Sequence, residues 1–305
     1  MEINVIEKYV LSSDKDHKLH GLIYCPEGEI KGFFQVVHDM AEYIGRYDKF
    51  CRSMAEEGYL VFGYDHLGHG KTARDDSELG FIAYENGWEY LVDDVAVFAN
   101  AVKADYPVHA PFFLMGHSVG SFIARLAAEK YCMQDKLIIM GTGGPQPISG
   151  VGEAFLRGEK RIHGSRFISE IAYSLMFGNY TTHFEQDDRF SWLSTIKEER
   201  DIYRNDKFCN YFFTVSALID LVKLSRMANR NEWFSSSVIK KPILLVSGKD
   251  DPVGDYGHGV KKVYDRLTDK DADVKFVLFK NCRHELLHDI CADRVTEVIK
   301  DFCRS

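Results

Sequence analysis

Residues 112–131, FFLMGHSVGSFIARLAAEKY, contain the pattern that decides the fold. An apolar run typical of a buried strand enters the turn GHSVG, and a helical pattern leaves that turn at once. A sharp turn of this kind lifts Ser118 above the end of a sheet, and its two glycines let strand and helix approach closely. The G-x-S-x-G spacing alone is a weak signal, and an ordinary strand–helix turn is the alternative. The strand and helix on either side favour a turn that presents a reactive serine.

Other apolar runs lie before and after this segment, and their apolarity is continuous rather than alternating. Strands buried on both faces have this character, which favours a parallel sheet covered by helices. Helical patterns separate the runs, so the sequence predicts an α/β fold with a mostly parallel central sheet. The runs are FFQVV (33–37), YLVFGY (59–64), LIIM (137–140), ILLV (243–246) and VKFVLF (274–279), and the helical patterns cover 47–58, 88–107, 121–132 and 256–267.

A different pattern precedes this alternation, and another interrupts it. Residues 3–11 and 18–25 predict an antiparallel hairpin at the edge of the sheet. Between about 145 and 237 aromatic residues are dense and strand-like runs are missing, which predicts a helical cap inserted after the strand LIIM. The expected division is a core of residues 1–144 and 238–305 with a cap of residues 145–237.

Composition excludes several classes of protein. Forty-six acidic and 38 basic residues give a net charge of −8, which argues against a nucleic-acid partner. Seven scattered cysteines without a CxxC pair indicate neither a disulfide framework nor a zinc site. No apolar run approaches the roughly 20 residues that span a bilayer, and the N-terminus lacks the apolar segment of a signal peptide. A cytoplasmic location is expected.

A serine hydroxyl becomes a nucleophile only beside a general base that an acid orients. In an elbow of this type the expected chain order is serine, then aspartate or glutamate, then histidine. Asp250 and Asp251 follow the strand ILLV, and His284 follows the strand VKFVLF. Both loops lie at the sheet edge that carries Ser118. His288, one helical turn further on, is expected on a helix, so His284 is the predicted base. The residues alone do not decide which of the two aspartates is the acid.

Five motifs in this order give the chain a family resemblance. It resembles the monoacylglycerol lipase and lysophospholipase branch of the α/β-hydrolases over nearly its whole length. The cap segment WLSTIKEERDIYRNDKFCNYFFT (192–214) also resembles bacterial members of that branch. The motifs are HDMAEYIGRY (38–47), DHLGHGKT (65–72), GHSVG (116–120), GKDDPVG (248–254) and RHE (283–285).

The resemblance implies a serine hydrolase of monoacylglycerol-like or lysophospholipid-like esters, with a small-molecule or lipid substrate and no metal or organic cofactor. In this family the acid follows a glycine by three positions, which selects Asp251. Ser118 would attack the acyl carbonyl, and His284 would transfer the proton. The backbone N–H groups of Met40 and Val119 would hold the oxyanion.

The first motif departs from the family at two positions. Asp39 stands where the family has glycine, and Tyr43 where it has histidine. Asp39 would tolerate a left-handed backbone conformation better than most residues if the loop required one. Its carboxylate would oppose a developing oxyanion unless it points to solvent or pairs with a cation. A working but altered site is expected.

Other histidines have two interpretations each. His38, His66 and His69 could form a metal cluster, but no carboxylate or thiol group completes it. They are expected to hydrogen-bond the loops that frame the serine, and His117 is expected to pack against neighbouring loops rather than to react. We therefore expect His38 and His117 to frame the site, with no metal present.

Two further hypotheses concern the cap and the activity. The segment 155–180 mixes basic and apolar residues, so it packs over an acyl pocket or makes transient contact with a membrane surface. An aminopeptidase of the proline-iminopeptidase type would need cap carboxylates to hold a free amine. A non-catalytic ligand-binding protein would keep the fold alone. Candidate carboxylates for the aminopeptidase are Glu153, Glu159, Glu170 and Glu185.

Overall fold

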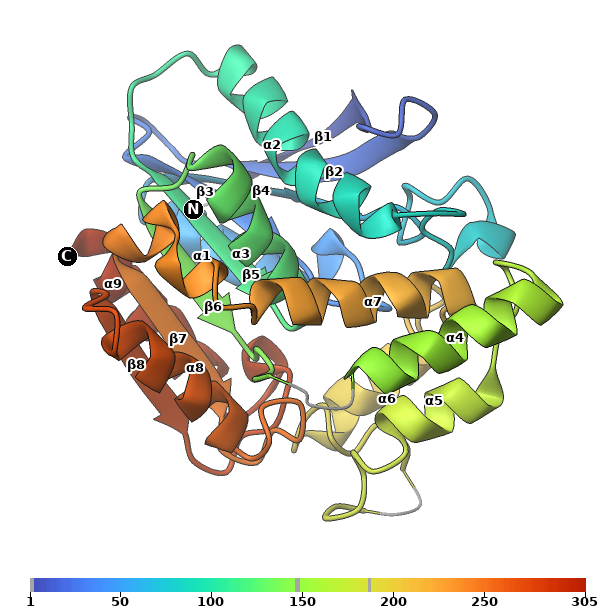
Figure 1. Cartoon of the computed structure of the whole chain (residues 1–305). Coiled ribbons are helices and arrows are strands. Elements are labelled where there is room, and N and C mark those ends of the chain that lie inside the picture. Colours follow the sequence, from blue (N-terminus) through green and yellow to red (C-terminus); the bar gives the residue numbers. More distant parts are fainter. Residues whose placement is uncertain (1–2, 146–148, 186–187) are drawn as a thin grey trace.

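The protein folds around a single eight-stranded sheet (Figure 1). The structure is a computed structural model that describes residues 3–145, 149–185 and 188–305. The strands lie in the order β1-β2-β4-β3-β5-β6-β7-β8. They are β1 Asn4–Leu11, β2 Lys18–Cys25, β3 Gly32–Val37, β4 Tyr59–Tyr64, β5 Phe112–His117, β6 Lys136–Met140, β7 Ile243–Gly248 and β8 Val274–Phe279.

The sheet is antiparallel near its N-terminal edge and parallel elsewhere. The β1–β2 and β2–β4 pairs are antiparallel, and all the other pairs are parallel. Strands β3, β4, β5 and β7 are buried at every position, as expected where helices cover both faces of a sheet. Strand β1, at the edge, is partly exposed along its length. The predicted fold class and the N-terminal hairpin are therefore confirmed.

Helices cover the two faces of the sheet in separate layers. Buried residues of α2 (Gly87–Asp105), α3 (Val119–Tyr131) and α8 (His258–Thr268) pack with one face. Those of α1 (Asp48–Glu56) and α9 (Ala292–Arg304) pack with the other. Short 3-10 helices are Ile44–Tyr47, Asp76–Glu78, Trp233–Ser235, Ser237–Lys240 and Leu286–His288.

The cap is helical and lies between β6 and β7 in the chain (Figure 1). Its helices are α4 Ser149–His163, α5 Glu170–Phe177, α6 Lys197–Asn205 and α7 Val215–Ala228. Helix α7 packs on α4 and also on α3 and α2 of the core. This helix therefore connects the two parts of the molecule. None of the helices in the described ranges is both long and apolar enough to cross a bilayer.

The turn between β5 and α3 needs glycine at two positions because backbone atoms occupy the space beside them. A Cβ atom on Gly116 would overlap the carbonyl oxygen of Gly120, and one on Gly120 would overlap the carbonyl oxygens of Val37 and His38. Helix α3 therefore approaches the end of β3 at backbone distance. This contact brings the turn after β5 and the loop after β3 together.

Substituting Gly120 tests this close approach. Gly120→Ala should lower the free energy of unfolding by about 2 kcal/mol or more, because rigid backbone must move to accept the methyl group. Gly158→Ala is the matched control, since no atom lies within 4 Å of the added Cβ and this position is interior to α4. It should be neutral or stabilising by up to about 1 kcal/mol. Chemical denaturation measures both variants, and equal effects would contradict the packing argument.

Candidate active site

Ser118 occupies the sharp turn between β5 and α3. Its backbone angles are φ 54° and ψ −118°, in the left-handed half of conformational space that a non-glycine residue rarely adopts. Such a conformation costs on the order of 1–3 kcal/mol and persists only when its surroundings hold it. Its own N–H donates to the carbonyl of Met140 at 2.8 Å. The turn therefore raises the serine above the sheet edge at the start of a helix.

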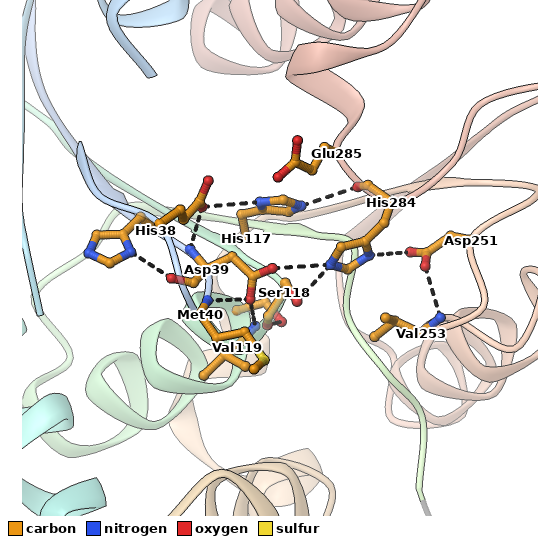
Figure 2. Close-up of polar contacts among 12 residues, drawn as sticks. His38, Asp39, Met40, His117, Ser118, Val119, Asp251, Val253, His284 and Glu285 are labelled. Carbon is orange, nitrogen blue, oxygen red and sulfur yellow. Dashed lines mark hydrogen bonds and ion pairs between the residues drawn. The ribbon is translucent and has the colours of Figure 1, made fainter. Parts of the chain in front are cut away.

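The structure brings the three predicted side chains together in a hydrogen-bonded chain (Figure 2). His284 Nε2 lies 2.8 Å from Ser118 Oγ, and His284 Nδ1 lies 3.0 Å from Asp251 Oδ2. Asp251 Oδ1 accepts a hydrogen bond from the N–H of Val253 at 2.9 Å. All three side chains are buried. They come from the loops after β5, β7 and β8, as the parallel sheet requires.

The neighbouring candidates lie elsewhere. Asp250 is partly exposed, and its backbone N–H donates to the carbonyl of Cys282, so this residue joins the loops after β7 and β8. His288 ends the 3-10 helix Leu286–His288, and its Nδ1 lies 3.2 Å from a carboxylate oxygen of Glu199 in the cap. Geometry therefore separates Asp251 from Asp250 and His284 from His288.

The loop after β3 places the Asp39 carboxylate inside the site. Asp39 is only 5% exposed, and its Oδ1 accepts hydrogen bonds from the N–H groups of Met40 at 2.6 Å and Val119 at 3.1 Å. Its Oδ2 lies 3.3 Å from His284 Nε2 (Figure 2). The carboxylate thus pairs with a cationic partner rather than with solvent. The left-handed conformation considered for Asp39 falls instead on Ala41, with φ 52°.

Asp39 and His284 shift each other's protonation. Burial favours the neutral imidazole, but the charges and hydrogen bonds of Asp251 and Asp39 outweigh burial and raise the pKa of His284 well above its usual value. Burial likewise opposes the Asp39 carboxylate, but the hydrogen bond and charge of His284 lower the pKa of Asp39. Both shifts favour an aspartate anion beside an imidazolium cation.

A second buried ion network supports the loop from the other side. Glu42 Oε1 accepts hydrogen bonds from the Asp39 N–H at 2.7 Å and the Tyr47 hydroxyl at 2.6 Å. Arg46 lies between Glu42 Oε2, 3.1 Å from its Nε, and Glu285 Oε2, 2.6 Å from a terminal nitrogen. Glu285 directly follows His284, so the network joins the loops after β3 and β8. The sequence motifs contain Glu42, Arg46 and Glu285 but do not predict that these residues pair; two acids and one arginine were the available signal.

Histidines frame the site as structural groups. His117 Nδ1 lies 2.9 Å from the Tyr47 hydroxyl, and its Nε2 lies 3.2 Å from the carbonyl of His284. His38 Nδ1 lies 2.6 Å from the Asp39 carbonyl, and its Nε2 accepts a hydrogen bond from the His66 N–H. Both rings therefore hold the backbone of loops that carry site residues.

The histidine cluster has no metal-binding arrangement. The rings of His38, His66 and His69 pack together with centroids 3.9–5.7 Å apart. Burial lowers the pKa of His69 to about 3, which keeps that imidazole neutral. Across the described part of the chain, no group of three or more His, Cys, Asp or Glu side chains is placed to hold a metal ion.

Comparison with known proteins identifies the family. A family model, Hydrolase_4, described as "Serine aminopeptidase, S33", matches residues 28–290. The chain belongs to this family. Monoglyceride lipase of Rattus norvegicus is 35% identical over 105 residues, 34% of this chain and 32% of that protein. The Mus musculus enzyme is 25% identical over 235 residues, 75% of this chain and 68% of that protein.

A solved structure extends the similarity to the whole fold of this Hydrolase_4 member. A thermostable carboxyl esterase from Bacillus coagulans, in complex with glycerol, has a TM-score of 0.91 and 28% identity. The match covers 99% of both chains. The expected membership of the monoacylglycerol lipase branch of the α/β-hydrolases is confirmed by these matches. The rat alignment spans about a third of that protein.

The Arg46 network gives a stability prediction. Arg46→Met should lower the free energy of unfolding by about 3–5 kcal/mol, because it leaves two buried carboxylates without their shared cation. Lys261→Met is the control, since Lys261 pairs with Asp265 on an exposed helix surface and should change stability by less than about 0.5 kcal/mol. Urea denaturation at neutral pH measures both. A small loss for Arg46→Met would show that the network carries little of the loop's stability.

Proposed function

We propose that this chain hydrolyses carboxylic esters through Ser118, His284 and Asp251. The observation that carries the proposal is the continuous hydrogen-bonded chain from Asp251 through His284 to Ser118. It has the order and distances that activate a serine hydroxyl. The similarity to monoglyceride lipases and to a carboxyl esterase supports the same reaction class.

The mechanism follows from the positions of the three groups. Ser118 Oγ attacks the acyl carbonyl while His284 Nε2 takes its proton, and Asp251 stabilises the imidazolium that forms. The N–H groups of Val119 and Met40 stabilise the oxyanion of the tetrahedral intermediate. His284 then protonates the leaving alcohol. A water molecule, deprotonated by the same imidazole, releases the acyl group from Ser118 as a carboxylic acid.

We further propose a monoacylglycerol-like or lysophospholipid-like substrate. Aromatic cap side chains beside the base support an apolar acyl group, since the Trp192 ring lies 5.1 Å from the His284 ring and 5.1 Å from that of Tyr180. An aminopeptidase is less favoured. Of its candidate carboxylates, Glu153 pairs with Arg157 and Arg226, Glu185 pairs with Arg283, and Glu170 is exposed.

An ester panel with Ser118→Ala and the matched variants Asp251→Asn and Asp250→Asn tests this proposal. Wild type should hydrolyse monoacylglycerols and p-nitrophenyl esters, and Ser118→Ala should remove both this activity and labelling by a fluorophosphonate probe. Asp251→Asn should lower kcat by about 10⁴-fold, whereas Asp250→Asn should keep it within a few fold. Faster cleavage of aminoacyl-β-naphthylamides than of every ester would favour the aminopeptidase. A wild type that neither turns over nor labels at Ser118 would favour a non-catalytic protein.

Transient contact of the cap with a membrane surface is a second part of the proposal. Helix α4 packs on α7, and its Val151 and Ile162 are exposed on the outside. Ile171 and Leu175 of α5 are exposed as well. Exposed aliphatic side chains on an amphipathic helix favour shallow insertion between lipid headgroups.

Vesicle sedimentation tests this contact. The double variant Ile162→Ser/Leu175→Ser should bind phosphatidylcholine vesicles more weakly than wild type, while hydrolysis of soluble p-nitrophenyl butyrate stays the same. Val108→Ser is the control, because Val108 is exposed but lies outside the cap. Equal vesicle binding by all three proteins would exclude the cap as the contact surface.

A further inference from the structure

The N–H groups that the proposed mechanism assigns to the oxyanion already have an acceptor. Both the Met40 N–H and the Val119 N–H donate to one oxygen of Asp39. That oxygen carries the same type of partial charge as the oxyanion of a tetrahedral intermediate. It therefore stands where the substrate oxygen would have to bind.

We propose that Asp39 is a built-in competitor for the oxyanion site, which its carboxylate fills in the resting protein and must leave before a substrate is activated. This inference rests on the proposed function, because it assigns the same two N–H groups to the oxyanion. It makes Asp39 a residue that sets how readily the site accepts an acyl carbonyl.

The first argument is energetic. A hydrogen bond from a backbone N–H to a carboxylate is charge-assisted and stronger than one to the neutral carbonyl of a bound ester. Asp39 holds two such bonds in a buried site, so an uncharged ester cannot displace it without loss of binding energy. The displaced carboxylate would also repel the negative charge that develops in the transition state.

The second argument concerns the general base. His284 Nε2 lies 2.8 Å from Ser118 Oγ and 3.3 Å from Asp39 Oδ2, so a proton on Nε2 faces both oxygens. An imidazolium that donates there cannot accept the serine proton. The ion pair described above therefore blocks the base as well as the oxyanion site.

Other charged groups around Asp39 do not replace this pairing. His117 favours the carboxylate by its charge when protonated, while Glu42 disfavours it. The Asp251 carboxylate pairs with the far side of the His284 ring. The phenols of Tyr180, Tyr203 and Tyr47 have pKa values raised by burial and stay neutral. His284 is therefore the principal cation that faces Asp39.

The loop geometry indicates how Asp39 leaves. Its N–H donates to Glu42, and its carbonyl lies 2.6 Å from His38 Nδ1. Those bonds hold the backbone, whereas rotation about the Cα–Cβ bond would break only the contacts of the carboxylate with Met40, Val119 and His284. Rotation alone would expose the two N–H groups in place, without movement of the loop.

Three proteins separate filling of the site from charge: wild type, Asp39→Ala and Asp39→Asn. Asp39→Ala should raise kcat/KM for p-nitrophenyl butyrate by about tenfold or more, since the donors become available. Asp39→Asn can keep its oxygen on both N–H groups, so its gain should be smaller. Asp250→Asn, the control, removes a charge from the loop after β7 and should leave kcat/KM unchanged.

The pH profile reports the charge of Asp39. His284 acts as a base only when neutral, above its pKa, and Asp39 raises that pKa. The acid limb of kcat/KM should therefore move to lower pH in both Asp39→Ala and Asp39→Asn. A limb that stays in place in both variants would overturn the proposed ion pair.

Acetate binding reports the vacant site without any need for turnover. Sodium acetate should shift the Met40 and Val119 amide NMR signals saturably in Asp39→Ala only, with sodium chloride as the ionic-strength control. Equal acetate binding by wild type, or none by a folded Asp39→Ala, would overturn the proposal. A tenfold loss of turnover in Asp39→Ala would do the same. Failure of the ester reaction itself would instead appear as a wild type that hydrolyses no ester and does not label at Ser118.

Discussion

Contact between the backbones of helix α3 and strand β3 at Gly120 is the constraint on which the site depends. No side chain fits between them, so the turn at Ser118 and the loop at Asp39 are held against each other. The N–H of Val119, at the start of α3, then reaches the Asp39 carboxylate from the neighbouring strand. The Ser118 backbone in this turn is strained, and the close packing around it keeps that conformation in place.

Buried charge organises the space that this contact creates. One series of charged side chains passes beside Ser118 and links the loops after β7, β8 and β3. Its members are Asp251, His284 and Asp39. On its other side, the Glu42, Arg46 and Glu285 series joins the loops after β3 and β8. Each acid lies beside a cation, which lets buried carboxylates stay ionised. The consequence is a site whose resting charges oppose the chemistry that we propose for it.

The cap contributes aromatic cover and a structural connection. Trp192 lies beside the His284 ring, and its carbonyl accepts the His284 N–H. The cap therefore helps to hold the loop that carries His284, while Asp251 contacts the imidazole itself. Helix α7 packs on two core helices, so the predicted boundary at residue 237 stays a prediction. The cytoplasmic location expected from the composition also stays a prediction.

The printed sequence determined the sheet, the family and the position of the serine, because each depends on local patterns. Continuous apolar runs predict buried parallel strands, and a strand-turn-helix pattern around GHSVG predicts the sharp turn. Local chemistry did not decide whether Asp250 or Asp251 is the acid that orients the histidine, and the spacing typical of the family was needed to choose between them. The catalytic roles of these residues stay predictions. Only the tertiary structure decided where the Asp39 carboxylate points, because the Val119 N–H that binds it lies 80 residues away in the chain and a side chain's orientation depends on the donors that folding places around it.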